Sequence, residues 1–174
     1  RSETMNRYNR GYNRYNNNQM RNSGMRNNYI PNPNSNQVIR LKDYGPEPFV
    51  VNIEDATEQN NNFRLALWTG ENLQVTLMSL NVGEDIGLEV HPNVDQFIRI
   101  DEGVGMVKMG SNEYNLNYEA RVSDDYAIMV PAGTWHNIIN IGNKPLKLYT
   151  IYAPPEHPRG TVHATKEIAM EEEK

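Results

Sequence analysis

Beyond residue 36 the chain alternates short apolar runs with clusters of glycine, proline, asparagine and aspartate. Short runs rich in β-branched and aromatic residues are typical of strands, and the residues between them are typical of turns. The pattern therefore predicts an all-β fold, and so many short strands suit a barrel. The segments that we expect to form strands are 38–41, 49–53, 63–68, 73–80, 87–91, 96–101, 105–109, 114–118, 127–130, 136–141 and 146–152. Only residues 164–173 have a helical pattern.

Turn residues lie between the expected strands. Each of these turns contains a glycine, which can adopt the positive φ that tight turns often require. The turns are 81–83, 101–103, 110–112, 132–133 and 142–143.

Two strand-like segments carry polar side chains of the kind that bind metals. Glu89 and His91 lie two residues apart, so both point to one face of an extended strand. Residues 131–135 form a turn that leads His136 into the next strand. If these strands are neighbours, the three side chains converge, and two imidazoles with one carboxylate can hold a divalent transition metal. The alternative is that each histidine is an ordinary half-buried residue satisfied by hydrogen bonds.

The spacing of these residues resembles that of the cupins, a family of small jelly-roll barrels with two motifs on facing strands. The first motif, G-x5-H-x-H-x3,4-E-x6-G, is similar to residues 83–103, where Glu89 and Gln96 replace the first histidine and the glutamate. The second, G-x5-P-x-G-x2-H-x3-N, is similar to residues 125–140, where an aspartate replaces the first glycine. The resemblance covers residues 37–163 and implies a single cupin jelly-roll β-barrel, followed by a short charged helix.

The resemblance also implies a metal site. In the family pattern three histidines and a glutamate bind the metal, so the corresponding set here is Glu89, His91, Gln96 and His136. An amide oxygen is a weak ligand, so Gln96 is either a fourth ligand or a group that orients a bound water. The implied cofactor is one divalent transition metal, Fe, Mn, Ni or Zn, because nitrogen and oxygen ligands do not choose among them. Many cupins have lost metal and activity, and an altered first motif is where such a loss would show.

A substrate pocket is expected beside this site. Residues 73–80 alternate between an apolar face and a mixed face, and the mixed face suits a ligand cavity. The residues that we expect to line the pocket are Gln74, Thr76, Met78, Ile98, Ile138 and Asn140. Arg99 points away from Ile98, so a surface or subunit-interface role is expected for it.

A segment rich in proline and glycine, residues 153–163, follows the last expected strand and contains His157 and His163. Such a segment could cover the mouth of the barrel, where a histidine could act as an acid or base near neutral pH. The alternative is an exposed connection with solvated histidines.

The first 36 residues form a separate region of low complexity. They contain twelve asparagines, four tyrosines, six arginines and one acid, which gives a net charge of +5 against −10 for the rest of the chain. With few aliphatic residues this tail cannot bury enough apolar surface to order itself, so we expect it to be disordered or arm-like. It could contact neighbouring protomers, bind single-stranded nucleic acid or remain solvated. Its composition resembles extensions of some bacterial spore-coat proteins, and the acidic domain makes nucleic acid the less favoured partner.

Two function classes follow. The first is a metal-dependent isomerase, oxygenase or decarboxylase that acts on a small polar substrate, sugar-like or carboxylate-like. The second is a non-catalytic structural protein, similar to a spore-coat protein, whose tail links protomers into a homodimer or larger assembly. The sequence has no cysteine, which excludes disulfides and thiolate ligands. It also shows no signal peptide and no membrane-spanning run, so we expect a location in the cytoplasm or in a spore or surface layer.

Overall fold

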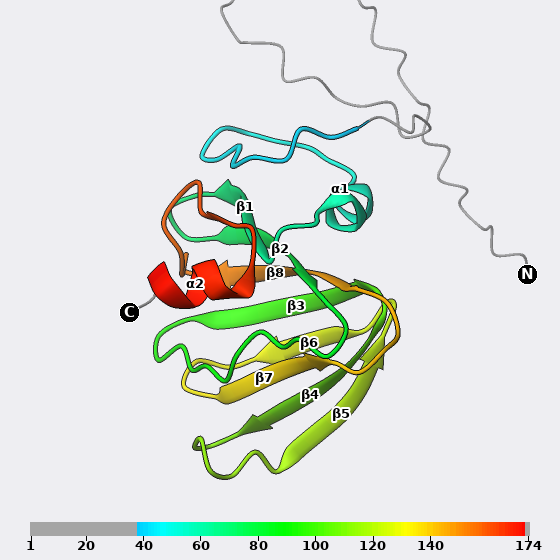
Figure 1. The fold of residues 1–174 in the computed structure, drawn as a ribbon. Coiled ribbons are helices and arrows are strands. Elements are labelled where there is room, and N and C mark those ends of the chain that lie inside the picture. Colours follow the sequence, from blue (N-terminus) through cyan, green and yellow to red (C-terminus); the bar gives the residue numbers. More distant parts are fainter. Residues whose placement is uncertain (1–37, 173–174) are drawn as a thin grey trace, which may run out of the picture.

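The structure is a computed structural model, and it describes residues 38–172. Figure 1 shows two β-sheets that curve around a shared interior, with two short helices packed against them. The helices are α1 (Ile53–Gln59) and α2 (Lys166–Glu172). The strands are β1 (Arg64–Thr69), β2 (Gln74–Leu80), β3 (Asp95–Glu102), β4 (Val104–Gly110), β5 (Tyr118–Ser123), β6 (Ala127–Val130), β7 (Trp135–Asn140), β8 (Leu146–Ala153) and β9 (Val162–His163).

The larger sheet has six strands in the order β6-β3-β8-β2-β1-β9, and the smaller has three in the order β5-β4-β7. All of the strand pairs are antiparallel. Strands that are distant in the sequence, such as β2 and β8, lie side by side, which is the connectivity of a jelly roll. The expected all-β barrel is therefore confirmed.

The main core lies between the two sheets and the second core lies outside the larger one. Leu80 and Ile100 of the larger sheet meet Val107 and Ile138 of the smaller sheet in the main core, and Ala169 of α2 joins them. The second core packs α1 against the outer face of β1 and β2, through Ala56, Leu65, Leu67 and Leu77. Neighbouring residues of β2 thus enter different cores, as the predicted alternation requires, because successive strand side chains point to opposite faces.

The prediction of a single helix and of a strand at 49–53 is wrong. Residues 53–59 form α1, and Asn52 caps it by accepting a hydrogen bond from the backbone N–H of Asp55. Asparagine followed by acidic residues is a helix-start signal, and here it outweighs the β-branched residues that precede it. Residues 38–41 are extended but belong to none of the strands, and Ile39 and Leu41 pack against the second core instead.

The strand predicted at 114–118 is also misplaced. Residues 111–117 form a turn around an Asn112–Asn115 bridge, and β5 begins only at Tyr118. Most of β5 is exposed and only Val122 is buried in it, so the strand has little apolar alternation for a pattern to detect. Residues 87–91 form no regular strand, although single bridges pair this region with β7.

Several of the predicted glycine turns have the expected left-handed conformation. Gly83, Gly103 and Gly133 have φ values of 80°, 97° and 79°. Asp125, which occupies the position of a family glycine, has a φ of 69°. Aspartate tolerates the left-handed region better than most residues, so the substitution preserves the turn.

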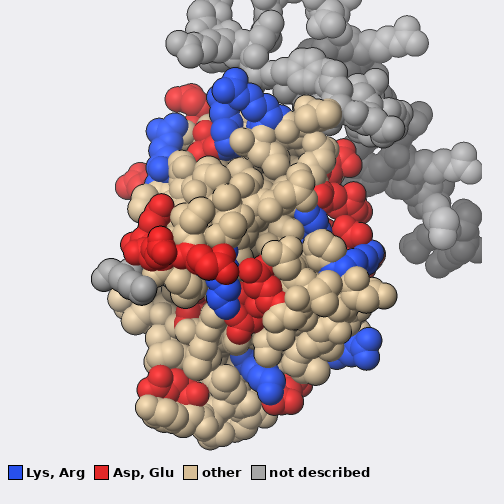
Figure 2. Space-filling view, in the orientation of Figure 1, with Lys and Arg blue, Asp and Glu red and all other residues tan. Residues whose placement is uncertain are grey.

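The tail lies outside the described residues. None of the helices within residues 38–172 has the length and apolar character that a membrane crossing demands. On the face drawn in Figure 2, acidic and basic side chains are interspersed with uncharged surface.

Candidate metal centre

The two predicted ligand segments are neighbours. The backbone N–H of Glu89 donates to the carbonyl of His136 at 3.0 Å, and the N–H of His136 donates back to the carbonyl of Glu89 at 2.9 Å. Residues that exchange both hydrogen bonds in an antiparallel pair present their side chains on the same face. Nearby, the N–H of Gly133 donates to the carbonyl of His91 at 2.8 Å, which ties the turn before β7 to the same segment.

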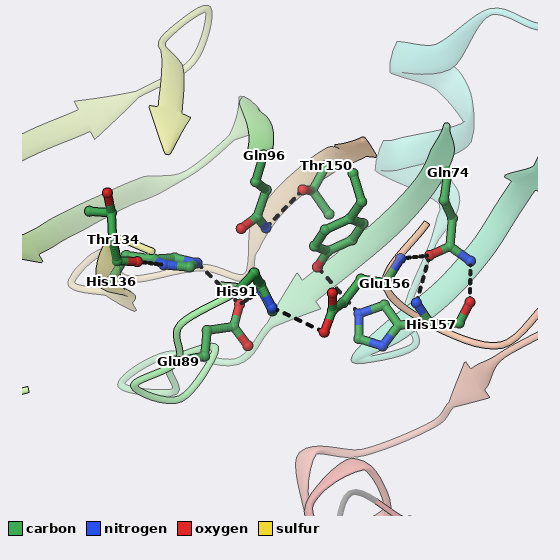
Figure 3. A network of polar contacts seen from close by, with 10 residues as sticks. Gln74, Glu89, His91, Gln96, Thr134, His136, Thr150, Glu156 and His157 are labelled. Atoms are coloured by element: carbon green, nitrogen blue, oxygen red, sulfur yellow. Dashed lines mark hydrogen bonds and ion pairs between the residues drawn. The ribbon is translucent and has the colours of Figure 1, made fainter. Parts of the chain in front are cut away.

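This pairing brings the side chains of Glu89, His91 and His136 together (Figure 3). Oε1 of Glu89 lies 3.2 Å from Nε2 of His91 and 3.3 Å from Nε2 of His136. One ligand atom from each of the three residues lies within 4.8 Å of the others. His136 is 1% exposed and His91 is 7% exposed, so the group lies inside the barrel wall.

The other nitrogen of each imidazole is held by an acceptor. Nδ1 of His136 donates to the backbone carbonyl of Thr134 at 2.9 Å. Nδ1 of His91 lies 3.1 Å from Oε1 of Glu156, and a carboxylate can only accept. In its neutral form each imidazole therefore carries its proton on Nδ1 and turns the lone pair of Nε2 towards Glu89.

In this arrangement the lone pairs of the three ligand atoms point towards one another. Two Nε2 lone pairs and a carboxylate oxygen converge, and Nε2 of His136 is buried with no hydrogen-bond partner among the described residues. Lone pairs at such distances repel unless a proton or a metal ion lies between them. The donor set of two nitrogens and one carboxylate oxygen suits a divalent transition metal, so the residues present fit the cofactor.

The electrostatics of the group agree with a negatively charged Glu89. Burial raises the pKa of its carboxyl, but the neighbouring imidazoles of His136 and His91 outweigh burial and bring the pKa to about 2. Burial lowers the pKa of His91, and the neighbouring Glu89 and Glu156 reverse this effect and raise it overall. The site thus has a charged oxygen ligand available across the physiological pH range.

Gln96 lies on β3 and projects towards the histidines in Figure 3. Its Nε2 donates to Oγ1 of Thr150 at 3.0 Å, which orients the amide. Its Oε1 is buried and has no hydrogen-bond partner among the described residues. An oriented amide oxygen without a partner is available to a metal or to a water bound to one.

The residues that were expected to line a pocket have different surroundings. Gln74 and Thr76 are fully buried in β2 and face the barrel interior. The three apolar members, Met78, Ile98 and Ile138, are packed in the main core. The side chain of Asn140 hydrogen-bonds to backbone groups. Its Nδ2 donates to the carbonyls of Leu80, Asn81 and Lys144, and its Oδ1 accepts from the N–H of Gly142.

The two histidines of the candidate lid have separate positions. His157 lies in the connection after β8, partly buried, with Nε2 3.4 Å from the hydroxyl of Tyr152. His163 is 4% exposed in β9, between Nη1 of Arg64 and Oε2 of Glu172. His163 is thus buried and His157 is partly buried, whereas Pro154, Glu156 and residues 158–160 of the connection are exposed.

Glu156 was not found by sequence reasoning. It belongs to neither cupin motif, and nothing in its spacing links it to His91. Its only signal in the sequence was a carboxylate beside a histidine within a proline-rich segment after the last long strand.

The chain belongs to the cupin superfamily: residues 76–152 match the family described as "Cupin domain". The chain is 69% identical to YrkC of Bacillus subtilis over 132 residues, which are 76% of this chain and 71% of YrkC. It is 42% identical to L612 of Acanthamoeba polyphaga mimivirus over 115 residues, which are 66% of this chain and 70% of L612. The crystal structure of BH2720 from Bacillus halodurans has 66% sequence identity and a TM-score of 0.75, over 75% of this chain and 99% of that one.

Proposed function

We propose that this cupin is a divalent-metal-dependent enzyme in which Glu89, His91 and His136 are the protein ligands. Gln96 is the fourth ligand or orients a water in the fourth position. The observation that supports this most is the convergence of three lone-pair donors, two of them imidazoles whose Nδ1 atoms are already held by acceptors. The substrate class that we propose is a small polar molecule, sugar-like or carboxylate-like.

A bound divalent metal would supply Lewis acidity and open coordination positions for an oxygen atom of the substrate. The surrounding side chains supply hydrogen bonds in a site shielded from water. Burial raises the pKa of Tyr152, so its hydroxyl remains protonated beside the ring of His91, at 5.6 Å between centroids. Burial and the charge of Arg64 lower the pKa of His157 to about 3, so this imidazole stays neutral. We propose that these neutral groups bind and orient oxygen atoms of the substrate.

Metal analysis tests this proposal directly. The full chain, expressed with Fe, Mn, Ni or Zn added in turn, should contain close to one equivalent of one metal by elemental analysis. His136→Ala should lose that metal, because it removes a ligand nitrogen. His163→Asn is the matched control, since His163 is also a buried histidine but lies outside the group. Metal-free wild-type protein under all four conditions, or unchanged metal content in His136→Ala, would contradict the proposal.

A further inference from the structure

A carboxylate from outside both sequence motifs contacts the candidate metal group. Glu156 lies in the segment 154–161, which connects β8 to β9, and its Oε1 is 3.1 Å from Nδ1 of His91. Nδ1 and Nε2 point in different directions from the imidazole, so Glu156 lies behind the ring while Nε2 faces Glu89 at 3.2 Å. Glu156 therefore contacts the ring as a support and is not one of the three converging ligands.

Gln74 holds this segment in place. Its Oε1 accepts from the backbone N–H groups of Glu156 at 3.3 Å and His157 at 2.9 Å. Its Nε2 donates to the carbonyl of His157 at 2.9 Å and to Oγ1 of Thr69 at 3.0 Å. All four hydrogen-bonding positions of the amide are used, and the residue is 0% exposed. Three of these four hydrogen bonds go to segment 154–161, so Gln74 holds the backbone of that segment, and Figure 3 shows the line of contacts from Gln74 to His91.

A second attachment lies further along the same segment. Oδ2 of Asp43 accepts from the N–H of Gly160 at 2.9 Å and from Oγ1 of Thr69 at 2.6 Å. The segment is thus anchored at Glu156 and His157 by Gln74 and at Gly160 by Asp43, two side chains outside the metal group. Its position is set by β1, β2 and the stretch before α1.

We propose that Glu156 is a positioning residue for His91. The hydrogen bonds that attach segment 154–161 to Gln74 then control the metal affinity of the site. The inference rests on the proposed function, since it requires that His91 binds metal. A carboxylate that accepts the Nδ1 proton fixes the tautomer and orientation of the ring and makes Nε2 a stronger ligand. Glu156 belongs to a segment that Gln74 holds in place. Metal binding to His91 and attachment of this segment to Gln74 therefore stabilise each other.

The first test compares metal affinity in three variants of the full chain. Co²⁺ serves as the probe, followed by titration and by its visible absorption bands, which report ligand geometry. Glu156→Ala should bind Co²⁺ about 10–100-fold more weakly. Glu156→Gln should lose less, because an amide oxygen still accepts from Nδ1. Glu113→Ala is the control, since Glu113 is exposed and lies in the turn before β5.

The absorption bands separate positioning from a general loss of stability. They should shift in Glu156→Ala and keep the wild-type shape in Glu113→Ala, because only the first change releases the His91 ring. Glu156 is partly exposed, so its variants should fold, and thermal unfolding of the metal-free proteins verifies this. Equal Co²⁺ affinity and identical bands in wild type and Glu156→Ala would overturn the inference. If wild type itself binds no metal, the proposed function fails instead.

The second test releases the segment without touching Glu156. Gln74→Met keeps the side-chain length but cannot make the four hydrogen bonds, so it should weaken Co²⁺ binding in the same direction. In the double variant with Glu156→Ala the two losses should not add, because both changes act through the same contact with His91. Full additivity would overturn the role of Gln74.

Discussion

At the scale of single residues, the site depends on which atom of each imidazole is free. Thr134 and Glu156 accept from the two Nδ1 atoms, so the chain itself selects Nε2 as the atom offered to a metal. The acceptor for Nδ1 of His136 is a backbone carbonyl, and the acceptor for Nδ1 of His91 is a carboxylate that is distant in the sequence. Arg99, by contrast, is neutralised on the other face of β3 by Asp101 and Asp125, as expected for a surface residue.

His157 should make the stability of the metal-free protein depend on pH. Its pKa is lowered from 6.5 to about 3 by burial and by the positive charge of Arg64, with His91 and His163 acting in the same direction and Glu89 opposing them. Between these two values the unfolded chain binds a proton that the folded chain does not, so the free energy of unfolding falls as the pH drops below about 6.5.

The slope from this one proton is at most about 1.4 kcal/mol per pH unit. Urea unfolding of the chelator-treated protein from pH 4.5 to 7.5 measures it, and His157→Gln should have a shallower slope over the acidic half of that range. Glu89, whose pKa is lowered from 4.5 to about 2 in the folded protein, contributes to the slope in both proteins, so the difference between them isolates His157. The same slope in both proteins would contradict a buried neutral imidazole.

At the scale of elements, the site is made by segments that carry little regular structure themselves. Residues 83–91 are not a strand, yet they follow β7 through the Asp85–Ile139 and Glu89–His136 bridges. Asn140 lies at the other end of this paired region. Its side-chain amide donates hydrogen bonds to three backbone carbonyls. Segment 154–161 then completes the site from the opposite sheet.

Asn140→Ala should destabilise the fold without removing the metal. The change leaves buried carbonyl groups without donors, and the loss of one such partner costs about 1–3 kcal/mol in the free energy of unfolding. Urea unfolding measures the loss, and elemental analysis should show unchanged metal per folded chain. Asn143→Ala is the control, since Asn143 is exposed in the following turn and should stay within about 0.5 kcal/mol of wild type. Loss of metal with little loss of stability would instead place Asn140 in the pocket.

At the scale of the whole molecule, the described residues 38–172 contain two sheets, two cores and the candidate metal group. The first 36 residues carry a net charge of +5, whereas the rest of the chain carries a net charge of −10. Such opposite charges favour contact between tail and domain, within one chain or between two, and salt would screen it.

A chain without residues 1–36 should fold and bind metal as the full chain does. The free energy of unfolding should agree within about 0.5 kcal/mol, and the metal content per chain should match, because Glu89, His91 and His136 all lie within residues 38–172. Light scattering after size exclusion compares the oligomers at low and high salt. A smaller oligomer at low salt would assign the tail to assembly, and an unchanged oligomer would make it a solvated extension. A truncated chain that fails to fold would contradict the domain boundary.

The elements with strong alternation were predictable and those without it were not. Residues 127–130 were expected as a strand and form β6, and β3 also agrees closely, because buried residues recur at nearly every second position of both strands. β5 was misplaced because Val122 is its only buried residue. α1 was missed because Val50 and Val51 precede it, and β-branched residues favour a strand.

The sequence by itself determined the all-β class and the proximity of Glu89 to His91, since local alternation and a two-residue spacing need no distant contact. It also supplied the spacing that made His136 a candidate neighbour. Only the tertiary structure decided that Glu89 pairs with His136 and that Glu156, fixed by Gln74, stands behind His91. Such contacts depend on the order of strands in the two sheets, which the burial of both cores selects and which no local pattern encodes.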